Sequence, residues 1–189
     1  MSRSAMASDR AAVPVSAAGS RPYLIPVFAV VFAVLWVDGH GIHLAANSIS
    51  RMLADARGGA ADSLTYFYDE VLGHYLWHTG VVGLSVLLVA RERPAGAGVA
   101  KGAARGALWA SGAVYGLTFF LIAVEGQTTP LGVPTAVLFT LYGLSQGRRL
   151  ARRPLLSFFL AGYLVATLLF AGWWAYWGSL PELSEVGLL

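Results

Sequence analysis

Apolar residues along this chain fall into five long runs, which are separated by shorter polar or basic segments. The runs cover residues 23–46, 67–90, 106–124, 131–145 and 155–177, and the longest polar segment between them covers residues 47–65. A helix of about 20 apolar residues matches the hydrocarbon core of a bilayer, which is about 30 Å thick. The pattern therefore predicts an all-α fold, a polytopic membrane bundle of about five transmembrane helices within residues 22–178.

The composition supports a membrane protein and excludes several kinds of site and partner. Of the 189 residues, 57% are hydrophobic and 12% are charged, whereas about 25% of the residues in soluble domains are charged. The chain has no cysteine, which excludes disulfides, thiolate metal sites and iron–sulfur clusters. The basic residues lie between the apolar runs rather than in one patch, so no nucleic-acid partner is expected. The expected partners are membrane lipid and a lipid-like substrate.

Basic residues are concentrated in alternate segments, which sets the expected orientation. If the amino terminus lies in the cytoplasm, only Arg51 and Arg57 of the 13 basic residues lie outside. Cytoplasmic loops of membrane proteins carry such an excess of Lys and Arg. We therefore predict a multi-pass protein of the cell membrane, with a disordered cytoplasmic tail at residues 1–21 and an external carboxyl-terminal tail at residues 179–189.

All four histidines lie in two polar clusters at the edges of the first two apolar runs. His40 and His43 come near the end of the first run, and Glu70, His74 and His78 begin the second. Residues four apart project from the same side of a helix, so Glu70, His74 and His78 should share one face. Ionisable groups are costly at membrane depth and tend to be functional there, which indicates a site between the helices.

Counting along the helices indicates how deep each polar group lies. At about 1.5 Å per residue, His43, Glu70 and Glu125 each lie about 30–33 Å from the basic residue at the other end of their own run. Three helices thus place ionisable groups in one layer, near the outer edge of the membrane. We expect the outer ends of the first three spans to adjoin there.

Imidazole nitrogens and carboxylate oxygens at this density favour a metal site. The candidate ligands are His40, His43, Glu70, His74 and His78, and the ion would be zinc, iron, copper or manganese. If the protein is an enzyme, a water made acidic by the metal would attack an ester or amide of a lipid, with Glu70 or Glu125 as the catalytic base. Asp38 and Asp69 are expected to be structural partners of these groups rather than ligands.

Whether the protein is an enzyme stays open, because the same residues suit other functions. A transporter would use them to relay a metal ion or protons, although below His78 the spans contain no further histidine, carboxylate or basic residue. A haem for electron transfer would be held by two histidines, for which His40 and His74 lie at similar depth. In an assembly factor, the cluster would only hold helices together.

Overall fold

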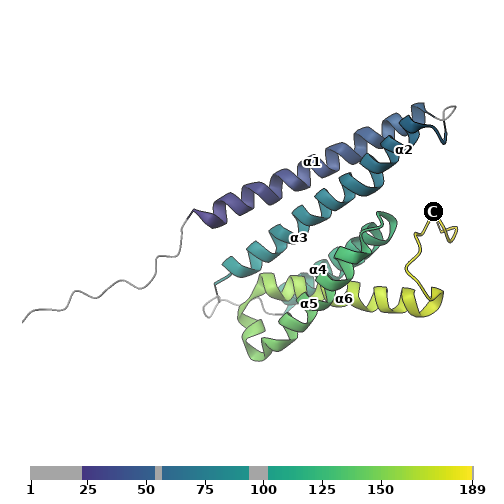
Figure 1. Cartoon of the computed structure of the whole chain (residues 1–189). Helices are drawn as coiled ribbons and strands as arrows, with labels where there is room; N and C mark the ends of the chain where they lie inside the picture. Colours follow the sequence, from purple (N-terminus) through teal and green to yellow (C-terminus); the bar gives the residue numbers. More distant parts are fainter. Residues whose placement is uncertain (1–22, 54–56, 94–101, 189) are drawn as a thin grey trace, which may run out of the picture.

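The computed structural model of the chain describes residues 23–53, 57–93 and 102–188, and every regular element in these ranges is helical (Figure 1). In chain order the elements are α1 (Leu24–Met52), α2 (Ala60–Tyr66), the π-helical turn η2 (Phe67–Gly73), α3 (His74–Arg91), α4 (Ala103–Glu125), α5 (Thr129–Ser145), the 3₁₀ helix η3 (Gly147–Arg152) and α6 (Pro154–Trp177). The expected amino-terminal tail at residues 1–21 lies outside the described residues.

Four helical stretches are long and apolar enough to cross a membrane, which confirms the predicted all-α membrane bundle. They are Leu24–Met52, Ala60–Arg91, Ala103–Glu125 and Pro154–Trp177. α5, the expected fourth span, has 17 residues and a length of about 26 Å, which is near the lower limit for a crossing.

α5 nevertheless reaches from one end of the bundle to the other. Thr128, just before α5, contacts His78 near the start of α3. Tyr142, in the last turn of α5, contacts Arg153, which also binds Val89 near the end of α3. α5 therefore returns the chain from the end of α4 to the start of α6. Its crossing of the membrane stays a prediction.

The first two helical stretches extend beyond the apolar runs, since residues 47–52 and 60–65 of the polar segment are helical. α1 continues to Met52, and the second helical stretch already begins at Ala60. The hydroxyls of Ser48 and Thr65 each donate to a carbonyl oxygen four residues earlier in their own helix, 2.8 Å away. Such bonds let polar side chains lie in a helix without interrupting it. These helices therefore do not end where the apolar runs end.

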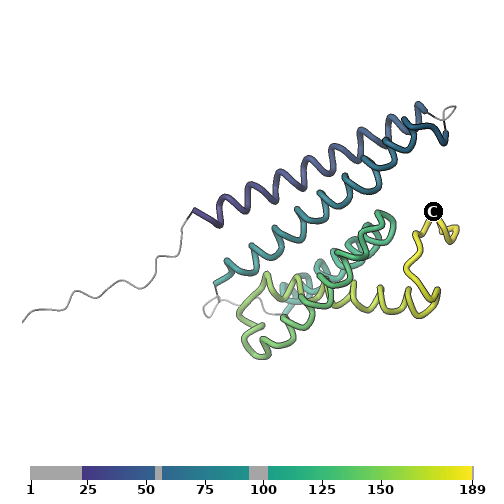
Figure 2. Tube along the Cα trace, viewed as in Figure 1, coloured from purple at the N-terminus to yellow at the C-terminus, as the bar shows by residue number. Residues whose placement is uncertain are grey.

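α1 and α3 lie side by side as an antiparallel pair, and glycines let their backbones approach closely (Figure 2). A β-carbon at Gly39 of α1 would lie 2.3 Å from the backbone nitrogen of Trp77. A β-carbon at Gly80 of α3 would lie 2.4 Å from the backbone nitrogen of Trp36. Only glycine fits at such contacts, so these two positions set the spacing of the pair. This close spacing brings the histidines of α1 next to α3.

α4 packs against α6 through a further glycine contact and an aromatic core. A β-carbon at Gly116 would lie 2.0 Å from the carbonyl oxygen of Gly162. Phe119 and Tyr163, both buried, pack edge to face with their ring centroids 5.2 Å apart. The hydroxyl of Tyr163 lies 3.1 Å from that of Tyr115, so each phenol has a hydrogen-bond partner in the apolar interior. α5 completes this group by packing on α6.

Glu92, directly after α3, joins the α1–α3 pair to the α4–α6 group. Its carboxylate accepts hydrogen bonds from the backbone N–H of Leu155 at 2.6 Å and of Leu156 at 3.1 Å, which caps the start of α6. The same carboxylate lies 3.3 Å from Nε of Arg153. Arg153 in turn donates to the carbonyl oxygen of Val89, 2.7 Å away. These contacts fix the end of the bundle that lies opposite the histidines.

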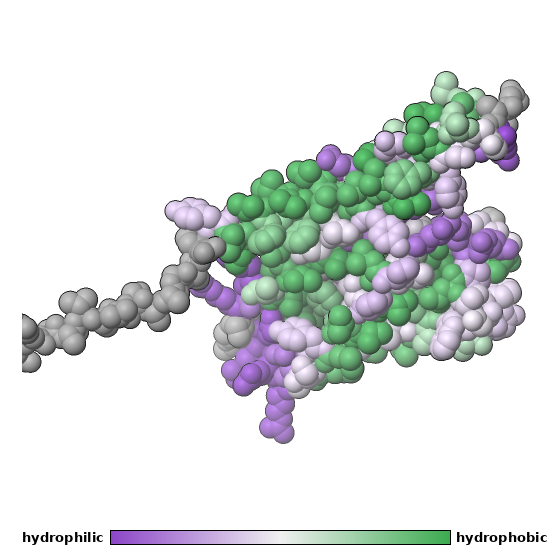
Figure 3. Space-filling view, in the orientation of Figure 1, coloured by the Kyte–Doolittle hydropathy of each residue, from purple (hydrophilic) through white to green (hydrophobic). Residues whose placement is uncertain are grey.

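The surface of the bundle is mostly apolar along the helices and more polar toward their ends (Figure 3). On α1, for example, the side chains of Val30 and Val37 are 63% and 62% exposed. A large apolar surface of this kind is unfavourable in water and suits contact with lipid tails. The apolar helices are therefore those of a membrane protein. Its placement in the cell membrane stays a prediction.

Candidate functional site

Side chains of the two predicted polar clusters meet in an open cavity of about 400 Å³ at one end of the bundle. The cavity lies where α1, η2, α3, α4 and the carboxyl-terminal tail meet, and it is lined by His43, Asn47, Glu70, His74, Trp77, Ile122, Glu125, Gly126, Glu182 and Ser184. The structure thus brings His43, Glu70 and Glu125 together, as their predicted depths require.

His43 of α1 contacts Asp69 of the π-helical turn. Its Nδ1 lies 2.6 Å from Oδ1 of Asp69, and Asp69 is buried. In a regular α-helix, Asp69 would lie at the margin of the face that Glu70 and His74 share. A π-helical turn contains more residues per turn and shifts this register, which brings Asp69 to α1. Asp69 is therefore a partner of a histidine, and it is held there by a type of turn that is frequent at functional sites.

His74, the first residue of α3, is held by Glu70 one turn earlier. Its Nδ1 lies 3.2 Å from the backbone carbonyl oxygen of Glu70 and 3.3 Å from Oε2 of the same residue. Both oxygens are acceptors, so in the neutral ring Nδ1 carries the proton and Nε2 keeps its lone pair. The predicted contact between residues four apart is present for this pair.

His78 lies one turn further along α3 and is nearly completely buried, with 2% of its surface exposed. Its Nδ1 forms a hydrogen bond with Oγ1 of Thr128, a buried residue between α4 and α5. The ring does not line the cavity but packs beside His74 and Trp77, with centroid distances of 6.1 Å and 5.2 Å. Its Nε2 is buried and has no hydrogen-bond partner among the described residues. Such an atom is a candidate ligand for a bound group.

The three histidines share one feature, since Nδ1 of each ring lies next to a polar atom of the protein, although the His43–Asp69 contact lacks hydrogen-bond geometry. The partners are Asp69 for His43, Glu70 for His74 and Thr128 for His78. Each ring therefore keeps Nε2 for another partner. Histidines that ligate a metal are almost always held in this way through their other nitrogen, often by a carboxylate.

The rings of His43 and His78 each lie close to the ring of His74, but the three do not converge on one point in this conformation. The ring centroids of His43 and His74 are 4.4 Å apart, and those of His74 and His78 are 6.1 Å apart. Within the ranges that the structure describes, no three His, Asp or Glu side chains are arranged so that they could hold an ion as they stand. The rings would have to turn for their Nε2 atoms to share a ligand.

His40 takes no part in these contacts, although the sequence predicts it as a ligand. Its exposed ring packs edge-on against Trp77, with the ring centroids 4.7 Å apart. His40 does not line the cavity, whereas His43, one turn later in α1, does. The structure therefore separates the two histidines of the first cluster, because only one of them faces the site.

Glu125, the last residue of α4, holds the carboxyl-terminal tail beside the cavity. Its Oε2 accepts hydrogen bonds from the backbone N–H of Leu183 at 2.9 Å and of Ser184 at 3.3 Å. The tail can turn back toward Glu125 because α6 ends at Gly178, whose φ of 72° is a left-handed conformation that favours glycine. Glu125 thus has a structural role, and its predicted role as a catalytic base stays a prediction.

Gln127 and Glu182 add polar contacts at the rim of the cavity. The side-chain amide of Gln127 donates to the hydroxyl of Tyr66 at 3.0 Å and also to the carboxylate of Glu182. The backbone of Gln127 is left-handed, with a φ of 50°, which is uncommon for a residue with a side chain. Desolvation by burial raises the pKa of Glu182 above its ordinary value, although the bond from Gln127 opposes this shift. The turn after α4 therefore links the second span to the tail.

The sequence analysis missed Thr128, Gln127 and Glu182 as parts of the site. They lie in a turn and a tail that are far from the histidines in the sequence, and no helical periodicity marks them. The sequence offered one signal for Gln127 and Thr128. The polar segment at 125–129 separates the third and fourth apolar runs at the predicted depth of the site.

Comparison with known proteins does not assign this arrangement. No family model matches the chain, and searches of curated proteins and of solved structures yield no match. A functional assignment therefore depends on the geometry of the histidine cluster itself.

Proposed function

We propose that this membrane protein binds one transition-metal ion, zinc, iron, copper or manganese, through Nε2 of His43, His74 and His78. The observation that carries the proposal is that Nδ1 of each of the three rings lies against a polar atom of the protein, a carboxylate for His43 and His74 and a hydroxyl for His78. Asp69, Glu70 and Thr128 then orient the rings. This ligand set differs from the sequence prediction, which includes His40 and treats Glu70 as a ligand.

The spacing of two of the three pairs of rings supports a shared ion. With metal–nitrogen distances of about 2.1 Å and tetrahedral angles, the centroids of two ligand rings lie about 5 Å apart. The separations of 4.4 Å and 6.1 Å lie on either side of this value. For one ion to reach all three rings, the side chains would have to rotate from these positions.

The burial of His78 also supports a bound ion. A buried polar atom that lacks a partner costs about 1–3 kcal/mol. Nε2 of His78 is such an atom among the described residues, and coordination to a metal would remove this cost. The proposal thus gives a physical reason for a histidine at this depth.

Three protein ligands leave a coordination position for water or substrate, as in catalytic rather than closed structural zinc sites. A metal held in this way supplies Lewis-acid chemistry and makes a bound water more acidic. Glu70 and Glu125 both line the cavity and are the candidate bases. The apolar surroundings favour a substrate that dissolves in the membrane. We therefore propose hydrolysis of an ester or amide of a lipid-like molecule as the activity.

A second function, helix association alone, is favoured by the same contacts. The His43–Asp69 contact joins α1 to η2, and the His78–Thr128 bond joins α3 to the turn before α5. In an assembly factor, these contacts would order the bundle without a metal. Metal content separates the two functions.

The test is the metal content of the full-length protein, purified without a histidine tag after growth with all four metals. We expect about one ion per wild-type chain, and its loss in His43→Ala, His74→Ala and His78→Ala. His40→Ala is the matched control and should keep the ion, because its ring lies outside the cluster. A wild type without stoichiometric metal, or an equal loss in His40→Ala, would contradict the metal site.

The hydrolytic activity needs a separate test. The metal-loaded protein is assayed with ester and amide lipids in mixed micelles, with His74→Ala as the inactive control. Metal binding without turnover of any such substrate would leave the metal site in place and remove the proposed reaction.

A further inference from the structure

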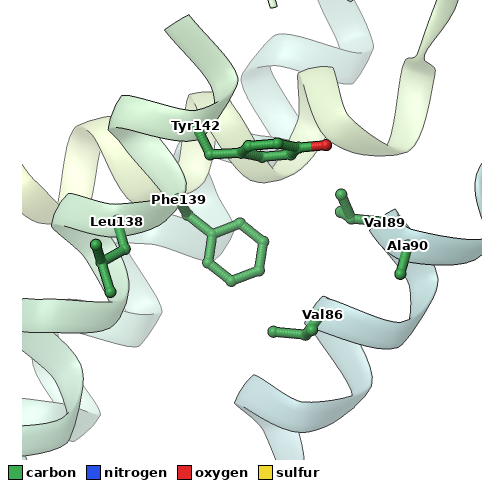
Figure 4. A pocket seen from close by; sticks show the side chains of 6 residues that line it. All are labelled: Val86, Val89, Ala90, Leu138, Phe139 and Tyr142. Atoms are coloured by element: carbon green, nitrogen blue, oxygen red, sulfur yellow. The ribbon is translucent and has the colours of Figure 1, made fainter. Parts of the chain in front are cut away.

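An apolar crevice opens between α3 and α5, away from the histidines (Figure 4). It has a volume of about 280 Å³ and is lined by Val86, Val89, Ala90, Leu138, Phe139 and Tyr142. In Figure 4 the rings of Phe139 and Tyr142 on α5 face the small side chains of α3. Walls of this kind accept a hydrocarbon chain, and the hydroxyl of Tyr142 lies at one end.

A polar pocket of about 420 Å³ adjoins this crevice and is lined by Glu92, Gln146, Arg149, Arg152 and Arg153. Tyr142 connects the two, because its ring lines the crevice and its hydroxyl accepts a hydrogen bond from Arg153 at 3.0 Å. Arg153 also donates to the carbonyl oxygen of Val89, another residue of the crevice wall. The apolar crevice therefore leads into a pocket with three arginines.

The polar pocket carries a net positive charge. Its single carboxylate, Glu92, is already balanced by Arg153 and by the backbone N–H groups at the start of α6. Arg149 and Arg152 are exposed, and among the described residues neither forms a salt bridge with a carboxylate. Both belong to η3, the connection between α5 and α6 at the end of the bundle. Two cationic side chains are thus available to an anion.

We propose that the crevice and the polar pocket together bind one phospholipid with an anionic headgroup. An acyl chain would lie between α3 and α5, and Arg149 and Arg152 would contact the phosphate. Basic pockets between membrane helices favour anionic lipids, and each arginine near the surface strengthens binding by about fivefold. A zwitterionic lipid would gain less, because its own cationic group would lie near the arginines.

A second apolar crevice shows which part of the site would provide selectivity. It lies between α5 and α6, has a volume of about 310 Å³, and is lined by Val133, Val137, Thr167, Phe170, Ala171, Trp174 and Leu180. No basic residue lines it. It can accept an acyl chain of any lipid, whereas the crevice between α3 and α5 adjoins arginines. Selectivity for charge is therefore expected at the α3–α5 crevice.

The headgroup test compares phosphatidylglycerol with phosphatidylcholine, bound to the purified full-length chain and measured by native mass spectrometry. The wild type should prefer phosphatidylglycerol, and the double variant Arg149→Gln/Arg152→Gln should lose about 25-fold in affinity for it. Arg148→Gln is the matched control, since it removes the same charge from η3 but does not line the pocket. It should lose less affinity than Arg149→Gln or Arg152→Gln alone, because Arg148 does not line the pocket. If the double variant does not fold, the single variants at these exposed positions replace it.

The acyl-chain test fills the crevice. Ala90→Trp should weaken binding of phosphatidylglycerol, whereas Leu88→Trp, at an exposed position of the same helix outside the crevice, should not. Glycerophosphoglycerol, the same headgroup without acyl chains, should compete poorly. Equal affinity for the two lipids would overturn the proposal. A loss in Arg148→Gln as large as that in the double variant would also overturn it, because binding would then depend on overall surface charge rather than on the pocket. Equal competition by the free headgroup would overturn the role of the crevice.

Discussion

His78 and Thr128 form a hydrogen bond across 50 positions of the sequence, between two side chains that are almost completely buried. The bond ties α3, which carries two histidines of the site, to the turn that precedes α5. It also occupies Nδ1 of the His78 ring and leaves Nε2 for another partner. A single hydroxyl thus contributes both to the packing of the bundle and to the orientation of a proposed ligand.

The first prediction concerns this hydroxyl. Thr128→Val keeps the shape of the side chain but removes the partner of His78, so the free energy of unfolding should fall by about 1–3 kcal/mol. Thr128→Ser, which keeps the hydroxyl, should lose less. Unfolding in mixed detergent micelles measures both variants. Equal losses in the two would show that the hydrogen bond contributes little.

The second prediction concerns the spacing of α1 and α3. Gly39→Ala places a methyl group against the backbone of Trp77, so it should destabilise the protein by about 1–3 kcal/mol. Gly41→Ala, two residues further along the same helix, meets nothing within 4 Å. It should be neutral or stabilising by up to about 1 kcal/mol, because alanine favours a helix. Thermal unfolding of the two variants compares them, and a similar effect of both would contradict the close contact.

The third prediction separates residues that bind the ion from residues that hold a ligand. Asp69→Ala and Glu70→Ala should weaken metal binding by about 10–100-fold without abolishing it, because these carboxylates contact rings rather than the ion. Glu125→Ala should keep the metal, since its Oε2 binds the backbone of the tail. Titration with zinc and a competing chelator measures the affinities. Complete loss in Glu70→Ala would instead support the ligand role that the sequence predicts.

The fourth prediction concerns orientation. Because the chain has no cysteine, single cysteines can be placed at Ala60, Leu188 and Gly98, the last of which lies outside the described residues. In intact cells, an impermeant thiol reagent should label Ala60→Cys and Leu188→Cys but not Gly98→Cys, as the distribution of basic residues predicts. Labelling of Gly98→Cys alone would reverse the orientation. Labelling of Ala60→Cys without Leu188→Cys would contradict the crossing by α5.

Much of the fold could be predicted from the sequence, because apolar runs of membrane length leave the backbone few alternatives to helix. The same argument placed His43, Glu70 and Glu125 at one depth, and they line one cavity. The helix ends between the first two spans differ from the limits of the apolar runs, because polar residues such as Ser48 bond within their own helix and do not end it. Polarity alone therefore did not mark the helix ends.

The sequence by itself determined that the chain forms membrane helices with a polar layer, since length, hydropathy and residue spacing are local properties. Only the tertiary structure decided how that layer is arranged. The π-helical turn brings Asp69 to His43, packing directs His40 onto Trp77 and away from the cavity, and Thr128 approaches His78 from a distant turn. These contacts depend on the register and rotation of whole helices, which are set by glycine contacts between helices rather than by the spacing of residues within one helix.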